Sequence, residues 1–311
     1  MEVQQPDAAR DPYGTPFVTA IVPVYNQADR LARCLAALAA QTYPRDRYEV
    51  VVVDNGSSED IRSVVVRWEG MRYAFEGQPG SYAARNRGVA LANGTVLAFT
   101  DADCLPVPGW LAAGVDALRM HPGCGLVGGH IEVCDPEDRR QDCVAWFESL
   151  TAFNQERYIS VHRFAGAGNL FTWKDIFARV GGFDATLFSG GDQEWGRRVW
   201  NAGYTLHYAP EAIVVHPPRG SLVELCRREL QYTGGEYLLR QRAGGYPMGA
   251  WLADVGRDLR PRVRLYRKMY MDGRLKGPGE LARFVLMTCL LGWVRAAERV
   301  RLRLGGVPRR N

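Results

Sequence analysis

Short apolar runs alternate along the first hundred positions with stretches whose apolar residues recur every three or four positions. Residues 18–24 and 50–53 are almost wholly apolar, which predicts two buried strands. Residues 71–75 and 95–100 are the next two expected strands. A helix is expected after the first strand, capped by Asn26 and burying one face. That face is made of Leu31, Leu35, Leu38 and Ala39.

Further helices are expected after the second and third strands, through Trp68 and over residues 82–91. Strands alternating with helices predict an α/β fold with a Rossmann-like, mostly parallel central sheet flanked by helices. Ligands of such sheets bind beyond the carboxyl ends of the strands, near the point where strand order reverses. Polar side chains follow three of the expected strands, and we expect them to converge: Tyr25 and Asn26, Asp54 and Asn55, Asp101 and Asp103.

After residue 105 the apolar runs are shorter and separated by glycines, which we interpret as a substrate-binding half of the same domain. Helices are expected over residues 221–245 and 281–304. The predicted organisation is a loose leader, 1–16, a catalytic domain, 17–220, and a helical basic extension, 221–311. The catalytic domain divides into a nucleotide-binding half, 17–103, and an acceptor and sugar half, 104–220.

The charge is uneven along the chain. Of 39 basic and 34 acidic residues, 15 and 4 lie in residues 257–311, which leaves 24 and 30 in the first 256. This basic tail predicts a phosphate-bearing acceptor or peripheral association with an anionic membrane. We expect no nucleic-acid partner. The apolar centre of the last helix, 284–294, is shorter than the roughly 20 residues of a spanning helix. The alternative is a helix packed on the catalytic domain with a solvated basic face.

The seven cysteines are odd in number and form no Cys-x-x-Cys pair, so neither a disulfide framework nor a zinc site is indicated. The polar amino terminus does not look like a secretion signal. These features predict a cytoplasmic protein, with the inner face of the plasma membrane as the site of any peripheral association.

Two carboxylates, Asp101 and Asp103, follow the expected strand 95–100. Such a pair repels itself unless a cation lies between the two groups, which predicts a divalent metal that holds a phosphate. The alternative is a surface turn, in which aspartate is favoured for its own hydrogen bonds.

An ordered series of segments resembles family 2 glycosyltransferases of the GT-A fold. The resemblance spans roughly residues 17–217. Its segments are Val22-Pro23-Val24-Tyr25-Asn26, Val52-Val53-Asp54-Asn55-Gly56-Ser57-Ser58, residues 80–88, Phe99-Thr100-Asp101-Ala102-Asp103, Gly168-Asn169-Leu170, residues 180–184, Gly191-Asp192-Gln193-Glu194 with Arg198, and Val214-Val215-His216.

The resemblance implies an inverting, metal-dependent enzyme with Mn²⁺ or Mg²⁺. Asp103 is the implied metal ligand, since a hard cation with oxygen ligands neutralises the charge of a departing diphosphate. Asp101 is implied to lie near the ribose and to reach the metal through water. His216 is implied to be a later metal or diphosphate contact, and the alternative is a structural histidine.

The donor is implied to be a UDP-, GDP- or dTDP-sugar. Its implied contacts are Pro23, Tyr25, Asn26, Asp54, Arg85, Asp101, Gly168 and Asn169. For Tyr25 the alternative is a core-edge residue, for Asp54 a turn residue, for Arg85 a surface arginine, and for Gly168 an ordinary loop glycine. Asn169 is expected to hold sugar hydroxyls through its amide.

Asp192 is the implied catalytic base, which takes the proton of the acceptor hydroxyl. Gly191 stands where the family has an acid, while Glu194 matches the later acid and Arg198 follows it. The alternative for Asp192 is a helix N-cap, whose amides would lower its pKa.

Arg197-Arg198-Val199-Trp200 lacks the Gln-x-x-Arg-Trp pattern of processive members, which predicts transfer of a single sugar. The expected acceptor is a saccharide or a lipid-linked sugar, in cell-envelope polysaccharide or glycolipid synthesis. One alternative is a non-catalytic scaffold that keeps the fold. A sugar nucleotidyltransferase is the less favoured alternative.

Overall fold

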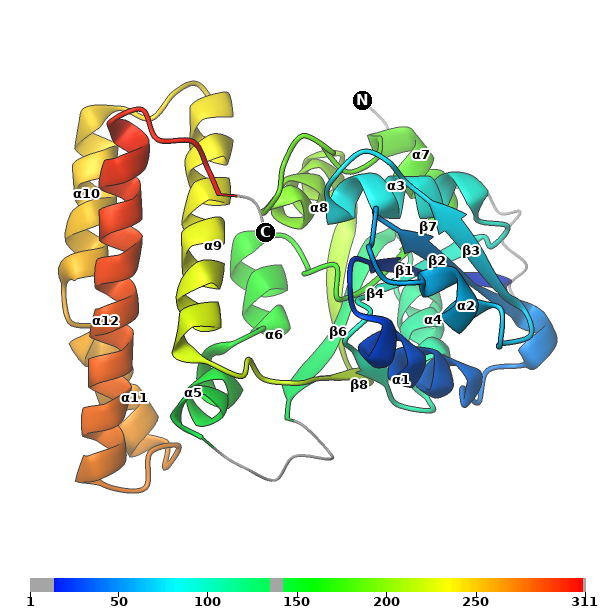
Figure 1. Ribbon diagram of the computed structural model, residues 1–311, viewed down its shortest axis with the longest axis horizontal. Helices are drawn as coiled ribbons and strands as arrows, with labels where there is room; N and C mark the ends of the chain where they lie inside the picture. The colour runs from blue at the N-terminus through cyan, green and yellow to red at the C-terminus, as the bar shows by residue number, and fades with distance from the viewer. Residues whose placement is uncertain (1–13, 135–141, 310–311) are drawn as a thin grey trace. The chain divides into compact units, whose positions relative to one another are not determined.

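The computed structural model describes residues 14–134 and 142–309 and divides into two compact units (Figure 1). Unit 1 comprises the described residues up to 134 together with 153–187 and 191–217. Unit 2 comprises the described residues 142–152, 188–190 and 218–309. Most of the predicted leader, residues 1–13, lies outside the described residues.

Unit 1 is built on one eight-stranded sheet in the order β3-β2-β1-β4-β7-β6-β8-β5. Its α/β architecture is the one that the alternating pattern predicts. The strands are β1 Val18–Val24, β2 Tyr48–Asp54, β3 Met71–Phe75, β4 Val96–Thr100, β5 Leu105–Pro106, β6 Cys124–Val133, β7 Asn169–Trp173 and β8 Thr205–His216.

The four amino-terminal strands pair in parallel, and strand order reverses between β1 and β4. The pairing of β1 with β4 stops at Ile21 and Phe99, whereas β1 continues alongside β2 to Val24. Pro23, which lacks a backbone N–H, thus lies where no β4 partner is required. The polar residues after these strands therefore gather at the reversal point.

The parallel strands are buried on both faces, which explains their continuous apolar sequence. Residues 50–53 of β2 have no exposed surface, and the same holds for all of residues 96–99 in β4. Burial of each such large apolar side chain contributes about 1.5–3 kcal/mol, so this end of the sheet is a rigid base for the loops that follow it.

The helices of unit 1 differ from the expected ones mainly at their starts. Asn26 does not cap the first helix; the N-cap is Gln27, which makes no side-chain capping bond. Cys34 replaces Ala39 on the buried face, and the second helix ends at Val65, short of Trp68. The bounds are α1 Ala28–Ala39, η1 Arg45–Arg47, α2 Ile61–Val65, α3 Ser81–Leu91, α4 Trp110–Met120, α6 Gln155–Arg157, η2 Tyr158–His162, α7 Lys174–Val180 and α8 Gly191–Asn201.

Unit 2 is helical, and its helices α9, α10 and α12 run alongside one another (Figure 1). The predicted helices 221–245 and 281–304 correspond to α9 and α12. Helix α5, which lies within the predicted 104–220 half, groups with unit 2. The bounds are α5 Cys143–Thr151, α9 Leu222–Arg242, α10 Met248–Leu259, α11 Val263–Met271 and α12 Pro278–Arg303.

Unit 2 has its own apolar core. The core joins α5, α9, α11 and α12 and consists of Val144, Phe147, Leu225, Tyr266, Met269, Leu275, Phe284, Met287 and Leu291. Three residues of the apolar centre of α12, Phe284, Met287 and Leu291, thus pack inside unit 2. Within residues 14–134 and 142–309, no helix combines the length and the apolar character needed to cross a membrane.

Candidate functional site

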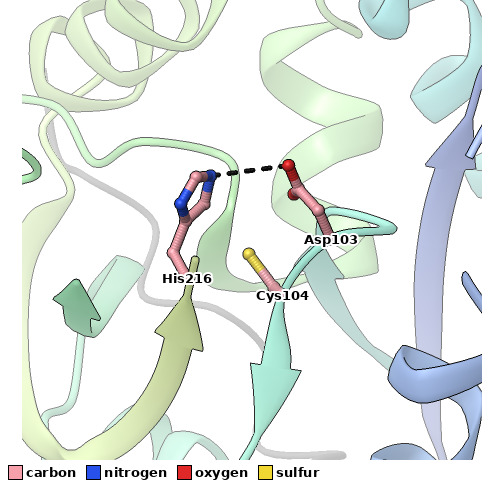
Figure 2. Close-up of side chains that lie close together, drawn as sticks. All are labelled: Asp103, Cys104 and His216. Carbon is pink, nitrogen blue, oxygen red and sulfur yellow. Dashed lines mark ion pairs between the residues drawn. The ribbon is translucent and has the colours of Figure 1, made fainter. Parts of the chain in front are cut away.

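The side chains of Asp103 and His216 point toward each other, although the two residues lie far apart in the sequence (Figure 2). Asp103 follows β4, and His216 is the last residue of β8; Oδ2 of the former lies 3.7 Å from Nε2 of the latter. His216 Nδ1 lies 2.7 Å from the carbonyl oxygen of Pro217. Because a carbonyl only accepts, Nδ1 carries the proton, and in the neutral ring the Nε2 lone pair points at the carboxylate. A cation between the two groups removes this conflict.

Two further side chains border this pair. Arg30 NH1 lies 3.7 Å from Asp103 Oδ2 and is half exposed, so it can move aside. The Cys104 thiol completes a cluster in which one ligand atom from each residue lies within 4.8 Å of the others. Burial, with a smaller effect of Asp103, raises the pKa of Cys104 well above its usual value. A hard divalent cation prefers the carboxylate to a thiol, so Asp103 and His216 are the residues that fit it.

Asp101, the first acid of the motif, forms an ion pair with Arg85 of α3. Arg85 is buried, with 5% of its surface exposed, so it is not a surface arginine. Its Nε atom is buried and has no hydrogen-bond partner among the described residues. A buried, incompletely satisfied guanidinium beside a carboxylate is suited to an anionic ligand.

The loop before β7 connects Asp101 with Asp192. A side-chain carbon on Gly168 would lie 3.0 Å from Asp101 Oδ2, so the absence of a side chain lets this loop approach the carboxylate. The preceding residue, Ala167, donates its backbone N–H to Asp192 Oδ2 at 3.3 Å. One residue of this loop thus binds the candidate base, while the next lies close to the metal-motif aspartate.

Asp192 lies in the first turn of α8, not before it, and is partly buried. Its Oδ1 atom accepts hydrogen bonds from the hydroxyl of Tyr82 at 3.1 Å and from the backbone N–H of Gln193 at 2.9 Å. Burial raises the pKa of Asp192, and Arg85 and the hydrogen bonds offset only part of the effect. The lowered pKa expected of a capping aspartate is therefore wrong, because desolvation dominates over the amides.

Gly191 is explained by Tyr82. A side-chain carbon at position 191 would lie 2.7 Å from the Tyr82 ring, closer than such carbons come to other atoms. The ring is held by Phe183, with 5.6 Å between the ring centroids. Tyr82 therefore occupies the space that an acid at position 191 would need.

Glu194 and Arg198 hold a neighbouring loop. Arg198 Nε and NH2 bind the carboxylate of Glu194 at 2.6 and 2.8 Å. The same guanidinium donates to the carbonyl oxygens of Val180 and Gly182, both at 2.6 Å. This pair fastens the 180–182 loop to α8 and so fixes the helix that carries Asp192.

The loops after β1 and β2 are tied together. Asn26 adopts a left-handed conformation, and its Oδ1 accepts from the backbone N–H of Ser58 at 2.7 Å. Asp54 accepts from the Ser57 N–H at 2.9 Å and from the Tyr73 hydroxyl at 3.1 Å, so the turn expected as its alternative role is present. Tyr25 is 55% exposed and is therefore not a core-edge residue.

Asn169 has a structural role. It is fully buried; its amide nitrogen donates to the carbonyl oxygens of His130 and Ala212, and its amide oxygen accepts from Trp110 Nε1. Contact with sugar hydroxyls would require these bonds to break. We therefore correct the expectation that this amide holds the donor sugar.

Comparisons with known proteins identify the family of this chain. A model of glycosyl transferase family 2 matches residues 19–177. Glycosyltransferase AglE of Haloferax volcanii is 38% identical over 226 residues, which are 71% of this chain and 73% of the relative. The chain belongs to glycosyl transferase family 2.

Other relatives of this family 2 glycosyltransferase are longer. The validoxylamine A glucosyltransferase of Streptomyces hygroscopicus subsp. jinggangensis is 32% identical over 62% of this chain, which spans 51% of the relative. The mannosyltransferase PcManGT from Pyrobaculum calidifontis, in complex with GDP-Man and Mn²⁺, superposes with a TM-score of 0.63 at 23% identity, over 96% of this chain and 91% of that one. The structural match confirms the predicted GT-A fold.

Tyr82, Arg30 and Cys104 are neighbours of the family 2 site that the motifs did not single out. Tyr82 lies three residues before Arg85, and residues at this spacing share one face of a helix. That spacing could have indicated Tyr82. The Arg30 contact had no comparable signal, because Arg30 and Asp103 lie far apart in the sequence.

Proposed function

We propose that this protein transfers a single sugar from a nucleotide-sugar donor to an acceptor hydroxyl, with inversion at the anomeric carbon. The observation that carries the proposal is the double connection between the metal motif and the base. Helix α3 binds Asp101 through Arg85 and Asp192 through Tyr82, while the loop residue Ala167 donates to Asp192 and its neighbour Gly168 lies close to Asp101.

Asp103 and His216 are proposed to hold a divalent cation, with Asp101 reaching it through water. When bound, the cation supplies Lewis-acid neutralisation of the diphosphate that departs from the sugar. The imidazole favours Mn²⁺ over Mg²⁺, because nitrogen ligands suit transition metals better than magnesium. Mn²⁺ is also present in the complex of PcManGT with GDP-Man and in that of GalNAc-T7 with UDP.

The donor is proposed to lie along the ends of β1, β2 and β4. Asp54 and the exposed ring of Tyr25 are proposed to contact the nucleoside, with Pro23 and Asn26 shaping this edge. Arg85 is placed for the diphosphate, because its unpartnered Nε can donate to an anion. Gly168 gives the donor sugar access to the backbone.

Asp192 is proposed to be the base through its Oδ2 atom. Oδ1 accepts two hydrogen bonds, whereas Oδ2 accepts the single long one from Ala167. Oδ2 thus has the greater capacity to accept the acceptor's proton as the hydroxyl oxygen attacks. The raised pKa also makes Asp192 a stronger base than an exposed aspartate.

The proposed acceptor is a saccharide or a lipid-linked sugar in cell-envelope polysaccharide or glycolipid synthesis. Support comes from the basic residues of unit 2, which suit a phosphate-bearing acceptor. Peripheral association with an anionic membrane through residues 257–311 belongs to the same proposal, and places the enzyme at a cytoplasmic membrane face.

The test separates the base from the metal site. Nucleotide-sugars are screened with Mn²⁺ for thermal stabilisation of the protein, and the anomeric configuration of the product is read by NMR. Asp192→Asn should keep Mn²⁺-dependent donor binding but lose at least ~10²-fold in transfer rate. Asp103→Ala should instead weaken the Mn²⁺-dependent stabilisation by donor.

Asp46→Asn, at an exposed position of η1, is the matched control and should behave as the wild type. Transfer by Asp192→Asn at the wild-type rate would remove Asp192 as the base. A product that retains the donor's anomeric configuration would refute inversion, and donor binding without any transfer to saccharide or lipid-linked acceptors would favour a scaffold.

A further inference from the structure

One exposed side of α12 is apolar from Leu286 to the end of the helix. Leu286, Trp293, Val300 and Leu304 follow one another at spacings of seven, seven and four residues, which place them on one side of a helix. Leu286 is 69% exposed and Trp293 59%, although the opposite side of the helix is buried in the core of unit 2. An exposed apolar stripe of this length marks a docking surface.

Helix α10 carries a second exposed stripe, formed by Met248, Leu252 and Leu259. The two helices run antiparallel, because Tyr246 and Trp251 pair with residues near the end of α12 while Asp258 pairs with Arg295. At about 100° per residue, the stripe on each helix lies roughly a quarter turn around the helix axis from the side that packs against the other helix. The rotation has the same sense along both chains, so in an antiparallel pair both stripes point to the same side. Together they form one surface, the α10–α12 face.

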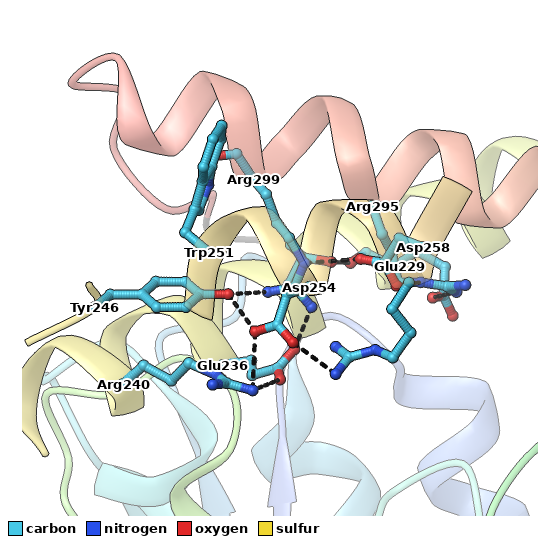
Figure 3. A network of polar contacts seen from close by, with 11 residues as sticks. Glu229, Glu236, Arg240, Tyr246, Trp251, Asp254, Asp258, Arg295 and Arg299 are labelled. Carbon is cyan, nitrogen blue, oxygen red and sulfur yellow. Dashed lines mark hydrogen bonds and ion pairs between the residues drawn. The ribbon is translucent and has the colours of Figure 1, made fainter. Parts of the chain in front are cut away.

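A network of ion pairs holds the two helices together (Figure 3). Arg299 Nε donates to Asp258 Oδ2 at 2.7 Å, and its NH2 donates to Glu236 of α9 at 2.6 Å. Arg295 binds Glu229 and Asp258 as well. The α10–α12 face is therefore a fixed surface with no need of a partner to order it.

Because this network buries acidic residues, the exposed charge of residues 257–309 is mostly positive. The acids Asp254, Asp258 and Glu298 are buried against arginines. Within described residues 257–309 the exposed acid is Asp272. The exposed bases are Arg257, Arg260, Arg262, Arg264, Arg267, Lys268, Arg274, Lys276, Arg283 and Arg309.

We propose that the α10–α12 face lies in the interface of an anionic lipid bilayer. Leu252, Leu286 and Trp293 would enter the boundary between headgroups and acyl chains, while exposed arginines of the same unit, such as Arg260 and Arg283, contact the lipid phosphates. A second copy of this chain fits less well, since both copies would carry the same excess of exposed basic residues in residues 257–309. This surface rests on the membrane association proposed above, and its binding to lipid does not depend on the chemistry of sugar transfer.

The experiment is flotation of the full chain with phosphatidylcholine vesicles that contain phosphatidylglycerol. Wild type should bind these vesicles, bind pure phosphatidylcholine much more weakly, and dissociate at high salt. Leu286→Ser combined with Trp293→Ser should lower the partition coefficient by at least about tenfold. Arg260→Glu combined with Arg264→Glu should lower it on the anionic vesicles.

The matched control is Met120→Ser combined with Val66→Ser, which removes two similarly exposed apolar side chains from unit 1 and should leave binding unchanged. Asp192→Asn should also bind as wild type, so a failure of the proposed catalysis is distinguishable from a failure here. Unchanged binding by the Leu286 and Trp293 double variant, with circular dichroism confirming its fold, would overturn the proposal. So would a stable wild-type dimer that this variant converts to monomer.

Discussion

Asp192 illustrates how two opposing effects at one residue are decided by burial. Three hydrogen bonds and the charge of Arg85 favour its ionised form, yet desolvation raises its pKa overall. Tyr82 remains a hydrogen-bond donor, because burial also raises the pKa of its phenol well above the usual range. The tyrosine therefore adjusts the base without competing for its proton.

Tyr82→Phe should shift the pH dependence of the enzyme. A base must be ionised to accept a proton, so kcat/KM falls as the pH decreases through the pKa of Asp192. The Tyr82 hydroxyl lowers that pKa, so its removal should raise the pKa further and move the acidic limb of the profile to higher pH.

The control for this profile is Tyr43→Phe, which removes a hydroxyl bonded to the carbonyl oxygen of Pro16. Its acidic limb should coincide with that of wild type. An unshifted limb in Tyr82→Phe would show that the hydroxyl does not act on the base.

At the scale of elements, the sequence pattern predicted the β1–β4 half of the sheet closely. Those strands are buried on both faces, so their apolar runs are continuous and their ends are marked by polar residues. Asn26 was wrongly predicted to cap a helix, because asparagine is equally suited to cap a helix and to bridge two loops. The contact between Tyr82 and Asp192 spans 110 residues, and local periodicity carries no information about such a separation.

The ion-pair network between α10 and α12 should make Asp258 important for stability. Its carboxylate is buried and binds both Arg295 and Arg299. Asp258→Ala would leave Arg299 in the interior with Glu236 as its remaining acid, which should cost about 3 kcal/mol in the free energy of unfolding, measured with urea.

Asp46→Ala removes an exposed acid beside Arg47 and should change the free energy of unfolding by less than about 0.5 kcal/mol. If Asp258→Ala were equally mild, the network would contribute little to holding the helices.

For the molecule as a whole, the chain passes between the two units more than once. Residues 142–152 and 188–190 belong to unit 2, although both are flanked by segments of unit 1. The predicted boundary at residue 220 did not separate α5 from unit 1. The sequence of an amphipathic helix shows which face is buried but not which helices cover that face. Val144 and Phe147 find those partners in α9, α11 and α12.

Removal of residues 218–311 should therefore damage the part that remains. Val144 and Phe147 would lose the apolar side chains that cover them, so the shortened chain should bind the dye ANS more strongly than the full chain and self-associate in gel filtration. A monomeric truncated protein with the dye binding of the full chain would show that α5 is stable without its partners.

The Tyr82 ring leaves no room for a side chain at position 191, and this constrains which residues related proteins can have at the two positions. An acid cannot return to position 191 while the aromatic ring remains, and a smaller residue at 82 leaves Asp192 without its hydroxyl donor. The two positions should therefore covary, with tyrosine accompanying glycine and a small side chain accompanying an acid. A change at either position alone would therefore impair the site, so the two positions should change together or not at all.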